Sequence, residues 1–526
     1  MHTKLLYSTL PLSGKMVAPK ITEKKALITP ASLVGYLPAR YVLAFWMFWG
    51  LVQMDSFNFE MNVTILAMTR NITDVDLPIV NTTKVTLLNT TSVTLVNKNN
   101  ATSMNTTKEH HLQDVHDTRY DWTSSEVNLI LGSFFWGYIS TQILGGWLVS
   151  RFGGKMIFGV CNLMMSLLSL LTPWLADLGS VSVVISRVLM GGFDGALRTC
   201  EFELWKNWAP RHEIGFFRGV CLSGISVGAV LSTVLNAYIC RQFGWTIVFY
   251  FYGVMGLLWC LFWMTLIHDS PDLHPRISIE EREYIKSNLT HSVSSCQERI
   301  NWVKVVKSPA FWAPTVANFS YQWIGLGMAT LFPAYLNNIL HLEISETGVF
   351  SSFGFVLGLI TYPVSGYLSD LFISREILSV KNTRKVMTSI GLFTPAVLTS
   401  MMCVTQSKLL TVVCITLSLG VAQSTMLGFS SNYIDIAPDL SAMLFAVGNS
   451  LGCSAGYFAP AVLEFISSFG ENGVNSEEVW RYFYVASLSI LFLGGLFFLV
   501  FAKEDTQQFS KEETLNNNAQ NSADLI

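Results

Sequence analysis

Twelve apolar stretches recur along the 526-residue chain, and each is long enough to cross a lipid bilayer as a helix. A lone strand is excluded because the hydrocarbon gives its backbone no hydrogen-bond partners. Charged residues make up 13% of the chain, about half of their share in soluble domains. The sequence therefore predicts an all-α membrane protein. The stretches begin near Tyr41, Glu126, Met156, Ser180, Phe217, Thr246, Phe311, Gly348, Val386, Leu409, Ala442 and Tyr482.

Lysine and arginine concentrate in alternate loops, which predicts the direction in which the chain crosses. Cytoplasmic loops of membrane proteins carry an excess of these residues. The first tail and the loops after the second, fourth and eighth stretches hold most of them, including Arg151, Lys155 and Arg218. The short loops on the other side are nearly bare and hold Arg241 and Lys408. Both termini are therefore expected in the cytoplasm.

The loop between the first and second stretches, residues 70–123, carries five glycosylation acceptor motifs. Five such motifs in one loop are a strong signal, because the charge distribution places this loop in the lumen or outside the cell. We therefore expect a glycosylated lumenal or extracellular loop. The acceptors are Asn71, Asn81, Asn89, Asn100 and Asn105.

A polar segment in the middle of the chain separates two groups of six stretches. Ser278 and Glu281 form the S-x-x-E pattern of a capping box, which predicts a short helix in that segment. The expected division is a cytoplasmic tail over 1–40, a six-helix bundle over 41–268, a cytoplasmic linker over 269–309, a second six-helix bundle over 310–502 and a cytoplasmic tail over 503–526.

The two groups of six also resemble each other in sequence. "STQILGGWLVS" (140–150) and "ITYPVSGYLSD" (360–370) each end the second stretch of their group. Glycines spaced four apart recur in "GISVG" and "GNSLGCSAG", and such spacing lets helices approach closely. Parallel repeats of six helices are the plan of major facilitator transporters. The predicted architecture is a major facilitator fold, with twelve transmembrane helices in two six-helix pseudo-repeats.

Several other classes of function are excluded or disfavoured by composition. The net charge of -3 and the lack of a basic face argue against nucleic-acid binding. The nine cysteines are dispersed and show neither a disulfide framework nor zinc spacing. There is no P-loop and no nucleophile-base arrangement, so we expect no enzyme, cofactor or metal. The expected partners are a small-molecule solute, a coupling ion and the lipid bilayer, with the chain acting as a monomer.

The fourth stretch carries four charges of alternating sign on one stripe of its helix. At about 100° per residue, Arg187, Asp194, Arg198 and Glu201 fall within roughly 60°. Pairing is expected between Asp194 and Arg198, and between Arg198 and Glu201. Intramembrane charges normally face a bundle interior or a water-filled path. The alternative is a structural ion-pair network that holds the first and fourth helices together.

A carboxylate, Glu60, lies near the middle of the first stretch. Its burial costs at least ~2.5 kcal/mol on insertion scales. We expect Glu60 to be tolerated because it faces a central cavity, where Arg187 or Arg198 offsets its charge. Polar residues of this stretch form two stripes, one of Gln53, Ser56, Glu60 and Thr64 and one of Asp55, Asn58 and Asn62.

Several long phrases resemble solute carrier family 17, which holds sodium-phosphate cotransporters, sialin and the vesicular glutamate and nucleotide transporters. The resemblance extends from about residue 40 to 502 and includes cytoplasmic segments that hydrophobicity alone does not dictate. It implies secondary active transport, usually of anions, driven by protons, sodium or membrane potential. The phrases are "LGSFFWGYISTQILGGWL", "FGGK", "LWKNWAP", "FGWTIVFYFYGVMGLLWCLFW", "DSPDLHPRISIEEREYI", "ILSVKNTRKVM" and "DIAP".

The sequence departs from this family at charged positions. Family members usually carry R-x-N in the first span, whereas this chain has Glu60 in place of the arginine and keeps Asn62. Tyr321 stands where the vesicular glutamate transporters place an arginine. The arginine and the acidic residue of the fourth span are kept as Arg187 and Asp194.

These residues define the candidate site. We expect Arg187 to contact the solute, with a cavity lining of Tyr321, Gln322 and Asn62. Coupling or gating is assigned to Glu60, Asp194, Arg198 and Glu201.

The charges of this set leave the substrate class open. Three carboxylates and two arginines sum to about -1 when all are ionised, which does not suit an anion. One interpretation is an anion site in which a carboxylate takes up the coupling proton. Another is a site recast for zwitterions or cations, and a third is a receptor or scaffold that transports nothing. Plasma membrane and lysosomal or vesicular membrane both remain open.

Overall fold

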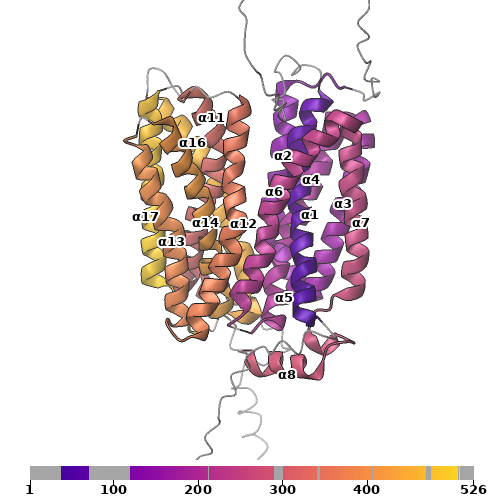
Figure 1. Ribbon diagram of the computed structural model, residues 1–526, viewed down its shortest axis with the longest axis vertical. Helices are drawn as coiled ribbons and strands as arrows, with labels where there is room; N and C mark the ends of the chain where they lie inside the picture. Colours follow the sequence, from indigo (N-terminus) through magenta and orange to yellow (C-terminus); the bar gives the residue numbers. More distant parts are fainter. Residues whose placement is uncertain are drawn as a thin grey trace, which may run out of the picture.

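The structure is a computed structural model that describes residues 37–69, 119–210, 212–289, 300–340, 344–405, 407–469, 476–507 and 509. The five glycosylation acceptors predicted between 70 and 123 lie outside these residues. Figure 1 shows two groups of helices standing side by side, with the short helix α8 beneath them.

The first group forms six crossings, and two of its helices divide one crossing between them. Its helices are α1 (Ala39–Met68), α2 (Ser124–Phe152), α3 (Gly154–Asp177), α4 (Ser180–Leu197), α5 (Cys200–Trp208), α6 (Ile214–Phe243) and α7 (Trp245–Leu266). The α4 helix stops at Leu197, and α5 continues the crossing after a two-residue turn.

The second group also forms six crossings, two of which are broken. Its helices are α10 (Pro309–Gln322), η3 (Trp323–Met328), α11 (Ala329–Asn338), α12 (Ile344–Ser374), α13 (Val380–Met402), α14 (Lys408–Ile436), α15 (Ser441–Cys453), α16 (Ala455–Ser467) and α17 (Glu477–Phe501). The η3 segment is a π-helix, a local widening that is frequent at functional sites.

The predicted twelve-helix major facilitator fold is confirmed, and each predicted start lies at a helix terminus or a few residues inside it. Among the described residues eight crossings meet a length and hydropathy criterion for spanning a membrane, with α4 and α5 taken together as one. The other four crossings are α1, α13, the one formed by α10, η3 and α11, and the one formed by α15 and α16. Polar residues lower the hydropathy of α1 and α13, and the breaks leave each helix of the other two crossings shorter than the 18 residues that the criterion requires.

The two groups meet along two close helix pairs, α6 with α12 and α2 with α15. A side chain at Gly366 on α12 would collide with the carbonyl oxygen of Gly215 on α6. On the other pair, a Cβ at Gly146 would lie 2.9 Å from the Cβ of Ala446. Glycine is required at such crossings because only a hydrogen fits between the backbones. Both contacts lie toward the α8 end, because Gly215 is the second residue of α6 and Gly146 lies in the last two turns of α2.

The linker helix α8 (Ile279–Asn288) begins where the capping pattern predicts. The Ser278 hydroxyl accepts from the Glu281 backbone N–H at 3.1 Å. The Glu281 carboxylate does not complete the capping box by accepting from the backbone N–H of Ser278. It accepts instead from the backbone N–H groups of Ala39 and Arg40, at 2.8 and 3.3 Å. It therefore caps α1, whose own N-cap residue, Pro38, makes no side-chain cap.

A second carboxylate caps α6 from across the interface. Asp370 on α12 accepts from the backbone N–H groups of Gly215 and Phe216, at 3.0 and 2.6 Å. Carboxylates stabilise helix N-termini because unpaired N–H groups and the helix dipole both favour negative charge there. This contact fastens the second bundle to the first at the α8 end.

Candidate functional site

Arg198 follows the last residue of α4 and carries a side chain that is 22% exposed. Its Nε lies 3.5 Å from Asp194 Oδ1, so the expected pair one helical turn apart does form. Its Nη2 lies 3.6 Å from Asp55 Oδ1 on α1. Both carboxylates are buried, and both separations exceed ordinary hydrogen-bond distances. These three side chains, the Arg198 cluster, carry a net charge of -1 when all are ionised, and no short hydrogen bond to either carboxylate fixes the guanidinium.

Two tyrosine hydroxyls and one glutamine amide of the second bundle lie opposite the Arg198 cluster. Tyr321 on α10 donates to Gln423 Oε1 on α14 at 2.6 Å. Its oxygen lies 3.1 Å from the Tyr362 hydroxyl on α12, which donates to it because the Tyr321 hydrogen is already used. Arg198 lies within electrostatic range of both tyrosines. The second bundle thus offers neutral hydrogen-bonding groups to a charge on the first.

Asn449 on α15 joins the two bundles through its amide. Its two N–H groups donate to Tyr138 Oη at 3.2 Å and to Gln142 Oε1 at 2.9 Å, both on α2. Its oxygen accepts from Asn318 at 3.1 Å and from Gln322 at 3.4 Å, both on α10. All the hydrogen-bonding positions of this buried amide are used, which fixes its orientation.

Arg187, the expected solute contact, is held by the backbone of α1. Its Nη1 and Nη2 donate to the carbonyl oxygens of Phe57 and Asn58, each at 3.0 Å. Its guanidinium carbon lies 4.7 Å from the centre of the Phe134 ring, and the side chain is 2% exposed. In this conformation Arg187 is engaged by the protein rather than turned toward an opening.

The structure contradicts the expected orientation of Glu60. Its Oε2 accepts from Ser169 Oγ on α3 at 2.9 Å, and Ser169 also contacts the carbonyl oxygen of Phe249 on α7 at 3.1 Å. Glu60 is fully buried within the first bundle and does not face the second. The sequence pattern separated the polar stripes of α1 correctly, but the stripe that faces the second bundle is the one with Asp55.

Glu201 also differs from the expected pairing. It accepts from Arg218 Nη2 at 2.9 Å rather than from Arg198. The turn at residues 198 and 199 rotates α5 relative to α4, so the assumption of one continuous stripe fails at this point. Arg218, which the charge rule placed in a cytoplasmic loop, is fully buried on α6.

The Arg218 side chain crosses to the second bundle. Its Nη1 donates to Ser431 Oγ at 2.8 Å and its Nη2 to Ser430 Oγ at 3.0 Å, both on α14. A fully buried guanidinium that reaches both bundles adds to the contacts that join them. Together with the Asp370 cap, it belongs to the α8 end rather than to the Arg198 cluster.

Of the remaining expected lining residues, Gln322 belongs to the central Asn449 network, whereas Asn62 lies toward the end of α1. Asn62 is exposed and lies one and two turns beyond Asn58 and Asp55 on the same face of α1. Gln322 is half-buried and also donates to Cys453 Sγ at 3.2 Å.

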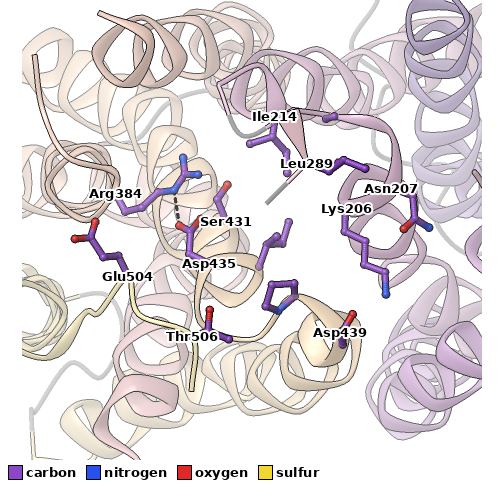
Figure 2. A pocket seen from close by; sticks show the side chains of 13 residues that line it. Lys206, Asn207, Ile214, Leu289, Arg384, Ser431, Asp435, Asp439, Glu504 and Thr506 are labelled. Carbon is purple, nitrogen blue, oxygen red and sulfur yellow. Dashed lines mark hydrogen bonds and ion pairs between the residues drawn. The ribbon is translucent and has the colours of Figure 1, made fainter. Parts of the chain in front are cut away.

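A separate pocket opens at the α8 end between the two bundles (Figure 2). Lys206 and Asn207 border it on one side, and the ion pair of Arg384 with Asp435, 2.9 Å apart, borders it on the other. None of the predicted site residues lines this pocket. Within the described residues there is also no group of three or more His, Cys, Asp or Glu that is suited to a metal ion.

Two central residues, Asp55 and Asn449, are absent from the predicted set. Both had a detectable signal, since an acid or an amide inside an apolar stretch is costly and usually functional. Asp55 lies on a polar stripe of α1, and Asn449 directly follows the first glycine of the motif "GNSLGCSAG".

Comparison with known proteins shows the following similarities. Residues 41–460 match the Major Facilitator Superfamily model. The chain is 34% identical to human sialin over 404 residues, covering 77% of this chain and 80% of sialin. It is 30% identical to mouse sodium-dependent phosphate transport protein 3, covering 75% and 82%. It is also 30% identical to human vesicular glutamate transporter 2, covering 75% and 68%.

A solved structure of similar fold is the fucose:proton symporter of E. coli. The TM-score is 0.57 at 12% identity, and the match covers 86% of this chain and 99% of the symporter chain. At this identity the likeness concerns the fold alone.

Proposed function

Because the chain belongs to the Major Facilitator Superfamily, and within it to solute carrier family 17, we propose that it carries a small organic anion together with protons. Its relatives are transporters and not enzymes, so transport across a membrane is the general activity. The solute and the coupling ion are the parts that we propose here.

The observation that supports this proposal is that the Arg198 guanidinium makes only long contacts with its two carboxylate partners. Arg187 and Arg384 make hydrogen bonds of 2.9–3.0 Å with protein acceptors and are 1–2% exposed. Arg198 instead has two charge contacts of 3.5 and 3.6 Å and is 22% exposed. A guanidinium presents five N–H donors in a planar fork that matches a carboxylate or a phosphate. Arg198 is therefore our candidate for the solute contact, in place of Arg187.

Proton coupling follows from the charge of this cluster. Asp55, Asp194 and Arg198 sum to -1 when all three are ionised, and this charge repels an anion. One proton on either carboxylate makes the cluster neutral, and two protons leave it at +1. Each proton removes a competitor for the guanidinium. An anion and one or two protons therefore favour each other's binding, as reciprocal linkage requires.

Alternating access supplies the transport step. The contacts of Asp370 with α6, of Arg218 with α14 and of Gly146 with α15 all join the two bundles toward the α8 end. We propose that this conformation is closed on that side, and that the Arg198 cluster becomes accessible from each side in turn. The contacts at the α8 end must then break during each cycle.

We propose that the α8 end faces the cytoplasm. The basic loops support this orientation, and the segment with the five glycosylation motifs then leaves Met68 on the opposite side. The membrane itself is either the plasma membrane or a lysosomal or vesicular membrane.

Solute flux in proteoliposomes tests the proposal. Uptake of radiolabelled glutamate, sialic acid and phosphate is measured under imposed proton, sodium or electrical gradients. We expect an organic anion to accumulate with an inward proton gradient, and Arg198→Gln to reduce the rate of this uptake strongly at low solute concentration. Arg282→Gln, on the exposed face of α8, is a matched control that removes one arginine without touching the cluster. Equal accumulation with and without an inward proton gradient refutes the proposed coupling.

A cationic or zwitterionic solute is the second candidate. The net charge of -1 favours it, because Asp55 then binds the amine while Arg198 stays with Asp194. The same assay discriminates the two, since a cation is taken up better as the external pH rises and the carboxylates ionise.

A further inference from the structure

Glu60 lies inside the first bundle, away from the Arg198 cluster. It belongs to a row of buried polar contacts between α1, α3 and α7. Gln53 on α1 donates to the Tyr252 carbonyl oxygen on α7 at 2.8 Å, two turns from Glu60. Ser169 on α3 lies between the Glu60 carboxyl and the Phe249 carbonyl oxygen. The contacts of Glu60 all come from the first bundle, so this site is distinct from the interface.

The hydrogen bonds around Glu60 do not suit an ionised carboxylate. Such a group accepts about four hydrogen bonds, and here a single neutral hydroxyl lies within reach. Oε1 is buried and has no hydrogen-bond partner among the described residues. Within the described part of the chain no lysine, arginine or histidine nitrogen lies within 4.0 Å of either oxygen. A fully buried charge with one neutral donor is strongly unfavourable.

A protonated Glu60 removes this conflict. The Ser169 hydroxyl has one hydrogen and faces two acceptors, Glu60 Oε2 at 2.9 Å and the Phe249 carbonyl oxygen at 3.1 Å. If Oε2 carries a proton, it donates to Ser169 Oγ, and Ser169 donates to Phe249. Each hydrogen then has one acceptor and no charge is buried.

We propose that Glu60 binds a proton in this conformation, and that Glu60, Ser169 and the Phe249 carbonyl form a proton site within the first bundle. The ligand is the proton itself. This site is separate from the carboxylates that pair with Arg198, so the protein holds two protonatable centres at different places.

The neighbouring titratable groups show where the charge goes when this proton leaves. Arg187 on α4 is the cation whose charge acts on Glu60, and its Nε is buried without a hydrogen-bond partner. Tyr252 on α7 is the other titratable group that faces Glu60, and Cys240 on α6 lies beside that tyrosine. An ionised Glu60 therefore has Arg187 as its available counter-charge.

Movement of Arg187 would release α1. Its guanidinium now holds the carbonyl oxygens of Phe57 and Asn58, which lie on the first helix beside Asp55. Deprotonation of Glu60 draws Arg187 toward the carboxylate and weakens these bonds. This link between the proton and α1 rests on the proposed function, whereas the occupancy of the proton site does not.

Infrared difference spectroscopy on the purified full-length protein in nanodiscs tests the site without any solute. A protonated carboxylic acid has a C=O stretching band that a carboxylate lacks. We expect such a band at neutral pH in the wild type, its loss in Glu60→Gln, and a shift of the band in Ser169→Ala, where its hydrogen bond is removed. Glu203→Gln is the matched control, because Glu203 is paired with Lys206 at 3.0 Å. We expect this variant to keep the band.

Two outcomes overturn the proposal. Identical spectra of wild type and Glu60→Gln mean that Glu60 carries no proton. Loss of the band on addition of sodium chloride, but not of choline chloride, means that a sodium ion replaces the proton and that this is a cation site. Ser169→Ala reports on the same band if Glu60→Gln fails to fold. Because no transport is measured, failure here leaves the proposed anion transport intact, and failed transport leaves this result intact.

Discussion

The two bundles share a fold, but among the described residues only the first buries charges at the centre of the molecule, on α1 and α4. It also buries Glu201 and Arg218 toward the α8 end. In the second, the buried charged residues of the described chain are Asp370, Arg384 and Asp435, all toward the α8 end. At the centre this bundle offers Tyr321 and the amide of Asn449, which are neutral. At the centre, the first bundle thus supplies the charge and the second supplies neutral hydrogen-bonding groups, whereas both bundles contribute to the closing contacts at the α8 end.

Because of this difference, we expect arginines in the two bundles to have different roles. An arginine of the second bundle should matter for folding or for closing the α8 end. Arg198 of the first bundle should matter for the solute. Variants in the two bundles therefore separate stability from binding.

The largest effect is expected for Arg384→Gln in the second bundle. It removes the guanidinium nitrogen that lies 2.9 Å from Asp435 Oδ2, and loss of one member of a buried ion pair costs about 3 kcal/mol or more. Thermal unfolding in detergent should shift strongly to lower temperature, while the protein that does fold keeps its half-saturating solute concentration. A large rise of that concentration with unchanged stability would place solute binding at the α8 end instead.

The next largest effect is expected for Arg198→Gln in the first bundle. Loss of a charged contact to a carboxylate costs about 2 kcal/mol or more, which is roughly a 30-fold loss of uptake at low solute concentration. Arg198→Lys should retain part of the activity, because the charge remains and the fork is lost. Normal initial rates for Arg198→Gln at equal surface abundance would remove this residue from the site.

A smaller effect is expected for Tyr321→Phe, which tests the contribution of the neutral hydrogen-bonding groups of the second bundle. The variant loses the hydroxyl that bonds Gln423, and a net hydrogen bond contributes about 1 kcal/mol. Initial-rate measurements should show a roughly fivefold rise in the half-saturating solute concentration, with an unchanged dependence on the proton gradient. A changed proton dependence would mean that the second bundle also takes part in coupling.

The smallest effect is expected for Asp272→Asn. Asp272 forms surface ion pairs with Arg282 and Lys286 in the linker, which belongs to neither bundle. Hydrogen bonds from Lys286 and Arg282 hold the pKa of Asp272 below its ordinary value. A lowered pKa gives stability that is present above the ordinary value of about 3.9 and is lost as the pH falls through the lowered one. Because the three side chains are about half exposed, solvent screens the contribution to at most about 0.5 kcal/mol.

Melting curves at pH 7 and at low pH check this prediction. Wild type and Asp272→Asn should differ slightly at pH 7 and converge as Asp272 of the wild type becomes protonated. A destabilisation comparable to that of Arg384→Gln would show that exposed and buried ion pairs are not distinguished in this protein.

The sequence predicts the crossings well because hydrocarbon thickness and backbone hydrogen bonding dictate them. The start of α8 and the pairing of Asp194 with Arg198 are local features, and both were predicted. The orientation of Glu60 was wrong because the periodicity of a helix separates its faces without saying which face meets which neighbour.

The partner of Glu201 was wrong for a different reason. A two-residue turn between α4 and α5 ends the regular 100° advance, and no glycine or proline marks it in the sequence. Arg218 was misplaced because the charge rule counts arginines near helix ends, and it cannot tell a loop residue from one drawn inside by Glu201 and two serines. Such long-range pairings need the fold itself.

The central claim is that two carboxylates compete with an anionic solute for one arginine. It is tested most directly by proton-driven uptake in proteoliposomes that contain the wild type or the Asp55→Asn, Asp194→Asn double variant. We predict that the wild type concentrates the solute under an inward proton gradient, whereas the double variant still exchanges solute across the membrane but no longer concentrates it. Accumulation by the double variant equal to that of the wild type would contradict the account.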